Sequence, residues 1–178
     1  SWLPNDVFVG IALLFFTLSL SDAHALQVHS DTNHLSLGLH TRYLETQDTK
    51  ADISEAIGWD QESRFTQSQM ETPAFGFSQS VWWFAVDLDY SGESEQEFLL
   101  EIAYPMLDHL EAYVLQANEV VGQWKVGDAL AFRDRPIQYR NFVLPVVLSP
   151  RDKVQVFLRV QTSGSMQVPL ELWSKTGF

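Results

Sequence analysis

The sequence contains no cysteine among its 178 residues. The chain can therefore form neither a disulfide scaffold nor a thiolate zinc site. The absence does not exclude an oxidising compartment, because a domain of this size buries a core large enough to fold without covalent cross-links. Hydrophobic residues make up 46% and charged residues 19% of the chain, which indicates one globular domain rather than a disordered segment.

Positive charge is also scarce. The chain has 11 Lys and Arg against 23 Asp and Glu, which gives a net charge of −12. Proteins that bind nucleic acid contact phosphates through Lys and Arg, so the sequence predicts no nucleic-acid partner. The same excess of carboxylates disfavours docking of the chain as a whole on an anionic membrane surface.

Catalytic and cofactor motifs are missing as well. There is no glycine-rich phosphate loop, the five histidines lack metal-ligand spacing, and residues 76–80 lack the final glycine of a nucleophile elbow. Residues 87–92 begin like a calcium loop, but Phe98 stands where the bidentate Glu is required, so we expect a hairpin turn. Asp87, Asp89 and Glu93 remain weak candidates for calcium. Otherwise the sequence predicts no cofactor, no catalytic residue and no enzyme.

Only one long apolar run is present, at residues 7–20. It is shorter than the about 20 residues that a membrane-spanning helix needs. The small residues Ala23 and Ala25 follow it and form a cleavage box, so we expect residues 1–25 to be a signal peptide and residues 26–34 a lead-in. The alternative is an amphiphilic or core helix.

The rest of the chain has the pattern of β-structure with one short helix. Asp52 as N-cap and Glu55 three residues later predict a helix that Gly58 ends. Alternating and β-branched segments predict strands over residues 36–44, 81–90, 97–104, 109–116, 119–126, 142–148, 154–162 and 167–173. Strands at this spacing are typical of an all-β sandwich or barrel.

Two features suggest a binding site. Arg133, Arg135 and Arg140 lie within eight residues of an acidic chain, and guanidinium groups bind carboxylates and phosphates through paired hydrogen bonds. The alternative is that they pair with nearby carboxylates and hold a long loop. Trp82 and Trp83 point to opposite faces of a strand, so one of them can line a groove; the alternative buries both.

Several motifs, in the same order along the chain, resemble those of one family. It comprises the extracytoplasmic sensor domains, second extracellular class, of bacterial seven-transmembrane receptors with diverse intracellular signalling modules. The motifs are residues 35–38 (LSLG), 75–83 (FGFSQSVWW), 100–105 (LEIAYP), 127–130 (GDAL), 135–137 (RPI), 140–142 (RNF) and 160–165 (VQTSGS).

This resemblance implies a jelly-roll β-sandwich similar to carbohydrate-binding modules, over residues 35–174, located in the periplasm. Residues 175–178 would begin the linker to seven membrane helices of an inner-membrane protein, followed by a cytoplasmic output module such as a histidine kinase or a diguanylate cyclase. The 178 residues are then the sensor part of a larger receptor.

We therefore expect a ligand-sensing domain that binds a small solute, namely a sugar, an amino acid or other carboxylate, or a cation. Arg135, Arg140, Asn141 and Asp128 are the predicted polar contacts, and Trp83 or Tyr104 is the predicted stacking wall. One alternative is a secreted carbohydrate-binding module or carbohydrate-active enzyme. Another is an interaction module that pairs with a second copy or a partner receptor and binds no small ligand.

Overall fold

The computed structural model describes residues 25–178, which form thirteen strands, one α-helix and two short 3-10 helices. The strands are β1 (Leu26–Val28), β2 (His34–Ser36), β3 (Arg42–Thr46), β4 (Thr66–Gln67), β5 (Ala74–Phe77), β6 (Val81–Tyr90), β7 (Gln96–Ile102), β8 (His109–Gln116), β9 (Glu119–Val126), β10 (Phe142–Leu148), β11 (Lys153–Gln161), β12 (Ser165–Gln167) and β13 (Leu170–Ser174). The helices are η1 (Gly38–His40), α1 (Ile53–Gln61) and η2 (Phe132–Asp134).

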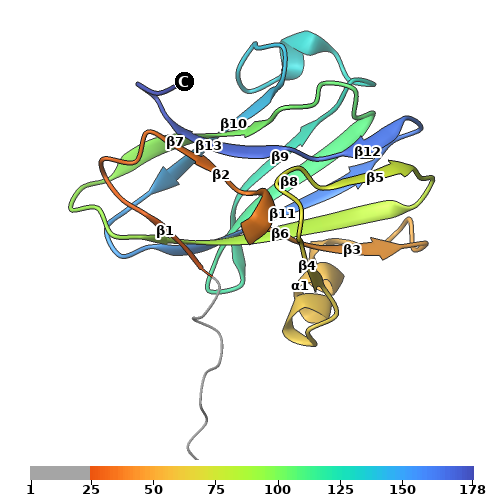
Figure 1. Cartoon of the computed structure of the whole chain (residues 1–178), viewed down its shortest axis with the longest axis horizontal. Coiled ribbons are helices and arrows are strands. Elements are labelled where there is room, and N and C mark those ends of the chain that lie inside the picture. Colours follow the sequence, from red (N-terminus) through yellow and green to blue (C-terminus); the bar gives the residue numbers. More distant parts are fainter. Residues whose placement is uncertain (1–24) are drawn as a thin grey trace, which may run out of the picture.

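Two sheets face each other (Figure 1). The larger has the order β4-β3-β6-β11-β8-β9, with β1 beside β6, and the smaller has the order β10-β7-β13-β2. A separate pair, β12 and β5, completes the strands. Leaving out β1, β3, β4, β5 and β12, the eight remaining strands are β2, β6, β7, β8, β9, β10, β11 and β13. The first, third, sixth and eighth of these form the smaller sheet, and the other four belong to the larger one. This arrangement is a jelly roll, so the predicted all-β jelly-roll sandwich with one short helix is confirmed.

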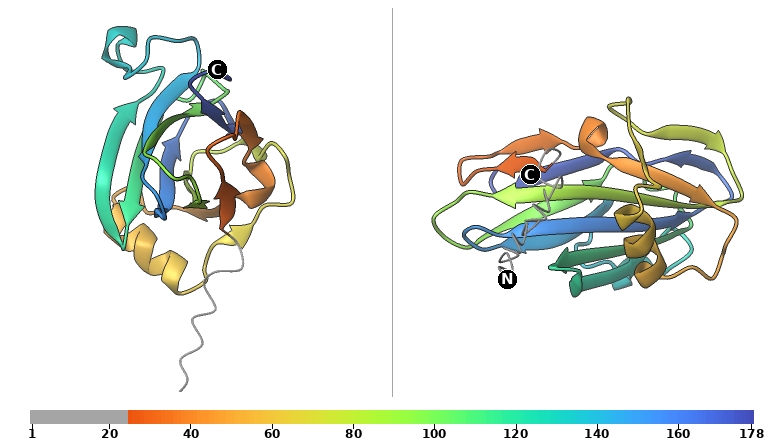
Figure 2. Two further views of the ribbon diagram at one scale, coloured as in Figure 1. Left: turned by 90° about the vertical axis from the view of Figure 1, so that its left-hand side faces the viewer. Right: turned by 90° about the horizontal axis from the view of Figure 1, so that it is seen from below.

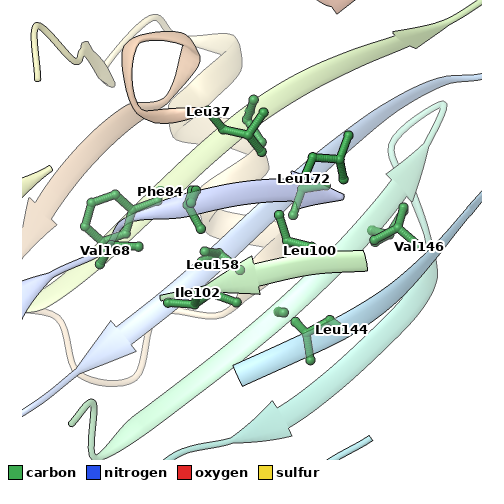
Figure 3. Packing of buried hydrophobic residues seen from close by; sticks show 14 of the residues in the cluster. Leu37, Phe84, Leu100, Ile102, Leu144, Val146, Leu158, Val168 and Leu172 are labelled. Carbon is green, nitrogen blue, oxygen red and sulfur yellow. The ribbon is translucent and has the colours of Figure 1, made fainter. Parts of the chain in front are cut away.

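The main core lies between the two sheets, because alternate residues of each strand point inward. Figure 3 shows Phe84 and Leu158 of the larger sheet facing Leu100, Ile102 and Leu144 of the smaller one. Each of these side chains is at most 1% exposed. The smaller sheet thus shields the inner face of the larger one from water.

A second, smaller core lies on the outer face of the larger sheet, where α1 covers it. Ala56 of α1 packs there on Trp83, Ala85, Tyr113 and Phe157, among other residues. Strand β6 is therefore buried on both faces, which explains why its sequence is apolar at nearly every position rather than at alternate ones.

Helix α1 begins as predicted. The Asp52 side chain accepts hydrogen bonds from the backbone of Ser54 and Glu55, and the Glu55 side chain accepts one from the Asp52 backbone. The prediction that Gly58 ends the helix is wrong, because α1 continues to Gln61. Gly58 is an ordinary helical residue, and the amide of Glu62 still bonds to its carbonyl.

The strand predicted over residues 36–44 exists only at its two ends, in β2 up to Ser36 and in β3 from Arg42. Residues 37–41 are not a strand. The chain turns through η1 instead, where the Thr41 hydroxyl donates to the Leu37 carbonyl at 2.8 Å. Gly38 permits this turn, because a Cβ at that position would lie 1.7 Å from the carbonyl oxygen of Glu71. The predicted segment 167–173 is divided between β12 and β13 at Pro169.

Apart from Ala25, the predicted signal peptide lies outside the described residues. Within residues 25–178, no helix combines the length and the apolar character that crossing a membrane requires.

Candidate functional site

An open groove runs between the two sheets on the side where β9 and β10 form their edges. Figure 2 shows these two strands along one flank of the sandwich. The groove has a volume of about 430 Å³. It is lined by Glu97, Val114, Gln116, Val121, Gly122, Trp124, Pro145, Val146, Val147, Ser149, Asp152 and Val154. Concave sites of this size, with an apolar lining and a few polar groups, are typical of small-molecule binding.

Trp124 is the largest side chain in the lining of the groove. Its indole packs against the main core and lies along Gly122, two residues earlier on the same face of β9. A Cβ at Gly122 would stand 2.9 Å from the indole Cη2. The missing side chain at Gly122 therefore lets the ring lie flat along the strand and form a wall of the groove.

The polar groups of the groove are mainly hydrogen-bond acceptors and amides. Asp152 Oδ2 accepts a hydrogen bond from the Ser149 amide at 2.7 Å. Glu97 lies 3.0 Å from the ammonium group of Lys175, so its charge is balanced by a residue outside the lining. Gln116 and the Ser149 hydroxyl can both donate and accept. Among the described residues that line the groove, none is Lys or Arg, so it offers an anionic ligand no counter-charge.

Arg135, the first of the predicted polar contacts, is half-buried and bound to its own loop. Its guanidinium carbon lies 4.9 Å from the ring centre of Phe132 and 4.5 Å from that of Phe142. Its Nη1 donates to the carbonyl oxygens of Tyr139 and Arg140 at 2.9 and 2.8 Å. These contacts make Arg135 a support of the loop, although its partners are rings and carbonyls rather than the carboxylates we considered.

The other predicted contacts do not converge on one cavity. Arg140 and Asp128 are exposed, and Tyr104 is half-buried against the main core. Asn141 is only 6% exposed, and its amide donates to Glu101 Oε1 at 2.6 Å. None of these four residues lines the groove between β9 and β10.

Trp83 offers no surface for stacking, because it is completely buried beneath α1. Trp82 is 6% exposed, so the structure shows the alternative in which both rings are buried. The sequence carried a signal for this, because residues 81–86 are apolar without alternation, as in strands that are buried on both faces.

The weak calcium candidates have other partners. Asp87 accepts hydrogen bonds from Arg42 at 3.0 Å, and Asp89 accepts one from Gln27 at 3.0 Å. Glu93 is exposed. Within residues 25–178, no group of three or more His, Asp or Glu side chains is arranged to hold a metal ion.

A second cavity, of about 370 Å³, lies at the end of the sandwich where β8 begins. The residues that line it are Gln79, Asp108, His109, Gln161, Thr162 and Ser163, all of polar types. Asp108 Oδ2 accepts hydrogen bonds from the Ser163 amide at 2.6 Å and from its hydroxyl at 2.7 Å. These bonds, the amide first, hold the pKa of Asp108 below its usual value.

We expect Asp108→Asn to lower the free energy of unfolding by about 1 kcal/mol at neutral pH, since it removes the charge that strengthens the two bonds from Ser163. Folding lowers the pKa of Asp108, so its contribution is present above about pH 4 and is lost as the pH falls further. Urea denaturation across this range checks it. Asp128→Asn is the control, because Asp128 is exposed and its carboxylate makes no hydrogen bond within the described residues. If the difference in unfolding free energy between Asp108→Asn and the unaltered chain is the same in acid as at neutral pH, the prediction is wrong.

Sequence reasoning missed the groove and its main residue, Trp124. One signal was available: Gly122 and Trp124 occupy alternate positions of a strand whose other face carries Gln123 and Lys125. A glycine two residues before an inward-facing tryptophan leaves room for the ring to lie along the strand.

Comparison with known proteins identifies the family. The family model 7TMR-DISM extracellular 2 matches residues 38–174. No curated protein matches this chain significantly.

Two solved structures give distant matches. The tryptic core variant of Cry1Da from Bacillus thuringiensis is 9% identical, with a TM-score of 0.43, and the match covers 84% of this chain and 24% of the toxin. This chain thus spans about a quarter of the toxin's length. CsCBM6-3 from Clostridium stercorarium, in complex with cellobiose, is 14% identical, with a TM-score of 0.27 and coverage of 58% and 82%. Because the family model covers more than half of the sequence, this chain belongs to the 7TMR-DISM extracellular 2 family, the extracellular sensor domains of seven-transmembrane receptors with diverse intracellular signalling domains.

Proposed function

We propose that this chain is the periplasmic sensor domain of a bacterial inner-membrane receptor and that it binds a small, neutral, hydroxylated solute in the groove between β9 and β10. The observation that carries this proposal is the Trp124 ring, which lies along the groove with carboxylate and amide groups beside it. The domain is non-catalytic: binding, rather than chemistry, is its output.

The chemistry of the groove favours one of the three solute classes considered from the sequence. A carboxylate ligand would meet Glu97 and Asp152 and no lining Lys or Arg. A metal cation would need several converging oxygen ligands, whereas Glu97 is paired with Lys175 and Asp152 caps the Ser149 amide. A sugar or polyol fits both parts of the groove, because its C–H face can stack on an indole while its hydroxyls donate to carboxylates.

A route from the groove to the membrane region follows from two contacts. Strands β9 and β10 form the two sides of the groove, and residues 127–141 join them directly. The ring of Tyr139 in this segment lies 4.9 Å from that of Phe178. On the other side, Glu97 of the groove pairs with Lys175. The domain can adopt arrangements that differ in the distance between β9 and β10. A solute that binds one arrangement more tightly shifts the equilibrium toward it, and with it the position of residues 175–178, the membrane helices and the cytoplasmic output.

The test is a thermal-shift series with neutral sugars and polyols, amino acids and other carboxylates, and divalent cations. We expect neutral hydroxylated solutes to raise the melting temperature and the charged classes to leave it unchanged. Gly122→Ala should weaken binding of the active solute about tenfold or more, since the new methyl group displaces the Trp124 ring. Trp124→Ala should do the same by removing the stacking surface.

The matched control is Gly58→Ala, because a Cβ at Gly58 in α1 meets nothing within 4 Å. It should bind the solute like the unaltered chain. If Gly122→Ala and Trp124→Ala fold normally and retain full affinity, the groove is not the site. If no solute stabilises the chain but it self-associates, the interaction-module alternative replaces the proposal.

A further inference from the structure

Residues 127–141, which we call the β9–β10 loop, project from the sandwich beside the C-terminal residues of the chain. Figures 1 and 2 both place this loop, with η2 at its tip, on the same side of the molecule as the C-terminus. The contact between Tyr139 and Phe178, and one between Phe178 and Trp173 at 6.2 Å, hold the two segments together.

The tip of the loop exposes apolar side chains. Leu130 is 37% exposed, Phe132 is 51% exposed and Tyr139 is 41% exposed. They are interspersed with arginines, and the side chain of Arg133 is 87% exposed. Aromatic rings next to long basic side chains suit the boundary between water and lipid, where an apolar body is buried and a polar end stays solvated.

The charge of the loop differs from that of the rest of the chain. Three arginines and two aspartates give the loop a charge of +1, whereas the whole chain carries −12. Neither Arg135 nor Arg140 has a carboxylate partner within residues 25–178, and Arg133 only reaches Asp134 at 3.9 Å. The exposed arginines of the loop, Arg133 and Arg140, are therefore available to an external anion.

We propose that the β9–β10 loop rests on the outer surface of the membrane, with Leu130 and Phe132 entering the headgroup layer and Arg133 and Arg140 meeting lipid phosphates. The inference rests on the proposed function in one respect: in such a receptor the membrane region follows the sensor domain, and Phe178 contacts this loop through Tyr139. Membrane contact would also hold the β9–β10 loop in place, so that a movement of β9 and β10 in the groove is transmitted to the rest of the domain.

Co-sedimentation with phospholipid vesicles tests the proposal. We expect the chain to bind vesicles of phosphatidylcholine mixed with phosphatidylglycerol, and to bind less in high salt or to pure phosphatidylcholine. Replacing both Arg133 and Arg140 by Ser should lower the partition constant roughly thirtyfold. Replacing both Leu130 and Phe132 by Ser should lower it about tenfold or more.

Matched controls come from exposed residues elsewhere. Leu39 and Phe77 are 49% and 85% exposed and lie outside both the loop and the groove, so replacing both by Ser tests the loss of apolar surface elsewhere. Arg64 and Arg151 replaced by Ser test the loss of two charges. Binding that falls equally in controls and loop variants would overturn the proposal, as would no binding of the unaltered chain to either vesicle.

Loop variants that change self-association in sedimentation velocity, and not vesicle binding, would make the loop a protein interface and overturn the proposal too. The result is independent of the solute site: Trp124→Ala should bind vesicles normally, and the loop variants should keep the thermal shift caused by the solute. Failure of one proposal can thus be told from failure of the other.

Discussion

Replacing Arg42 by Met should lower the free energy of unfolding by about 3–5 kcal/mol, the range observed when one partner of a buried ion pair is removed. Arg42 donates to Asp60 of α1 and to both carboxylate oxygens of Asp87 on β6, at 2.6–3.0 Å for the Nη contacts. The three side chains are 14–22% exposed, so water screens the charges only partly. Methionine keeps most of the aliphatic volume but leaves two carboxylates facing each other.

The pKa of Arg42 reflects both its burial and these two ion pairs. Burial alone would lower it, but Asp60 and Asp87 together raise it above the usual value. Urea denaturation of Arg42→Met at neutral pH measures the loss. Asp60→Asn in the Arg42→Met background should recover part of it, since one of the uncompensated charges disappears. A loss below 1 kcal/mol would show that the ion pair contributes no more than an exposed one.

Arg42 matters beyond stability because it fixes α1 over the second core. The indole nitrogen of Trp83 is buried there without a hydrogen-bond partner within the described residues. A buried N–H group without a partner costs free energy, which the surrounding apolar contacts under α1 must offset. Loss of the Arg42 contacts should therefore increase amide hydrogen exchange in α1 before it does so in β6.

The strands of the sandwich were largely predictable because each is specified by its own neighbours in sequence. Strands β6, β8, β9 and β10 have the predicted bounds. The short β1, β4 and β5 were not predicted, since two to four residues carry too little pattern and their pairing is decided by distant partners. Val28, for example, is buried only because β1 lies beside the end of β6.

The site was less predictable, for a physical reason. A groove between β9 and β10 depends on how far apart the edges of two sheets lie, and no local pattern encodes that distance. The arginine cluster was visible in the sequence, but the fate of each arginine depends on where the loop folds. Arg135 turns inward between two rings, whereas Arg133 and Arg140 stay outside. Residue type alone could not separate these roles.

Asn141, a predicted ligand contact, offers a second stability test with a large expected effect. Asn141→Asp should lower the free energy of unfolding by about 2–3 kcal/mol at neutral pH. It places a second carboxylate where the Asn141 amide now donates to Glu101, a residue only 7% exposed. Glu101 Oε2 also accepts a hydrogen bond from the Trp173 indole at 2.9 Å, so its carboxylate cannot turn away without losing that donor.

Combining Asn141→Asp with Glu101→Gln should restore most of the lost stability, because the new amide at position 101 can donate to the new carboxylate at position 141 and still accept from Trp173. The destabilisation by Asn141→Asp alone should also shrink in acid, because a proton taken up by the two facing carboxyl groups removes their repulsion. Urea denaturation of the three variants at several pH values measures both effects. If Asn141→Asp instead keeps full stability and weakens the response to solutes, Asn141 is a ligand contact. Full rescue by the exchanged pair, with solute binding intact, would show that this asparagine holds the β9–β10 loop onto the smaller sheet.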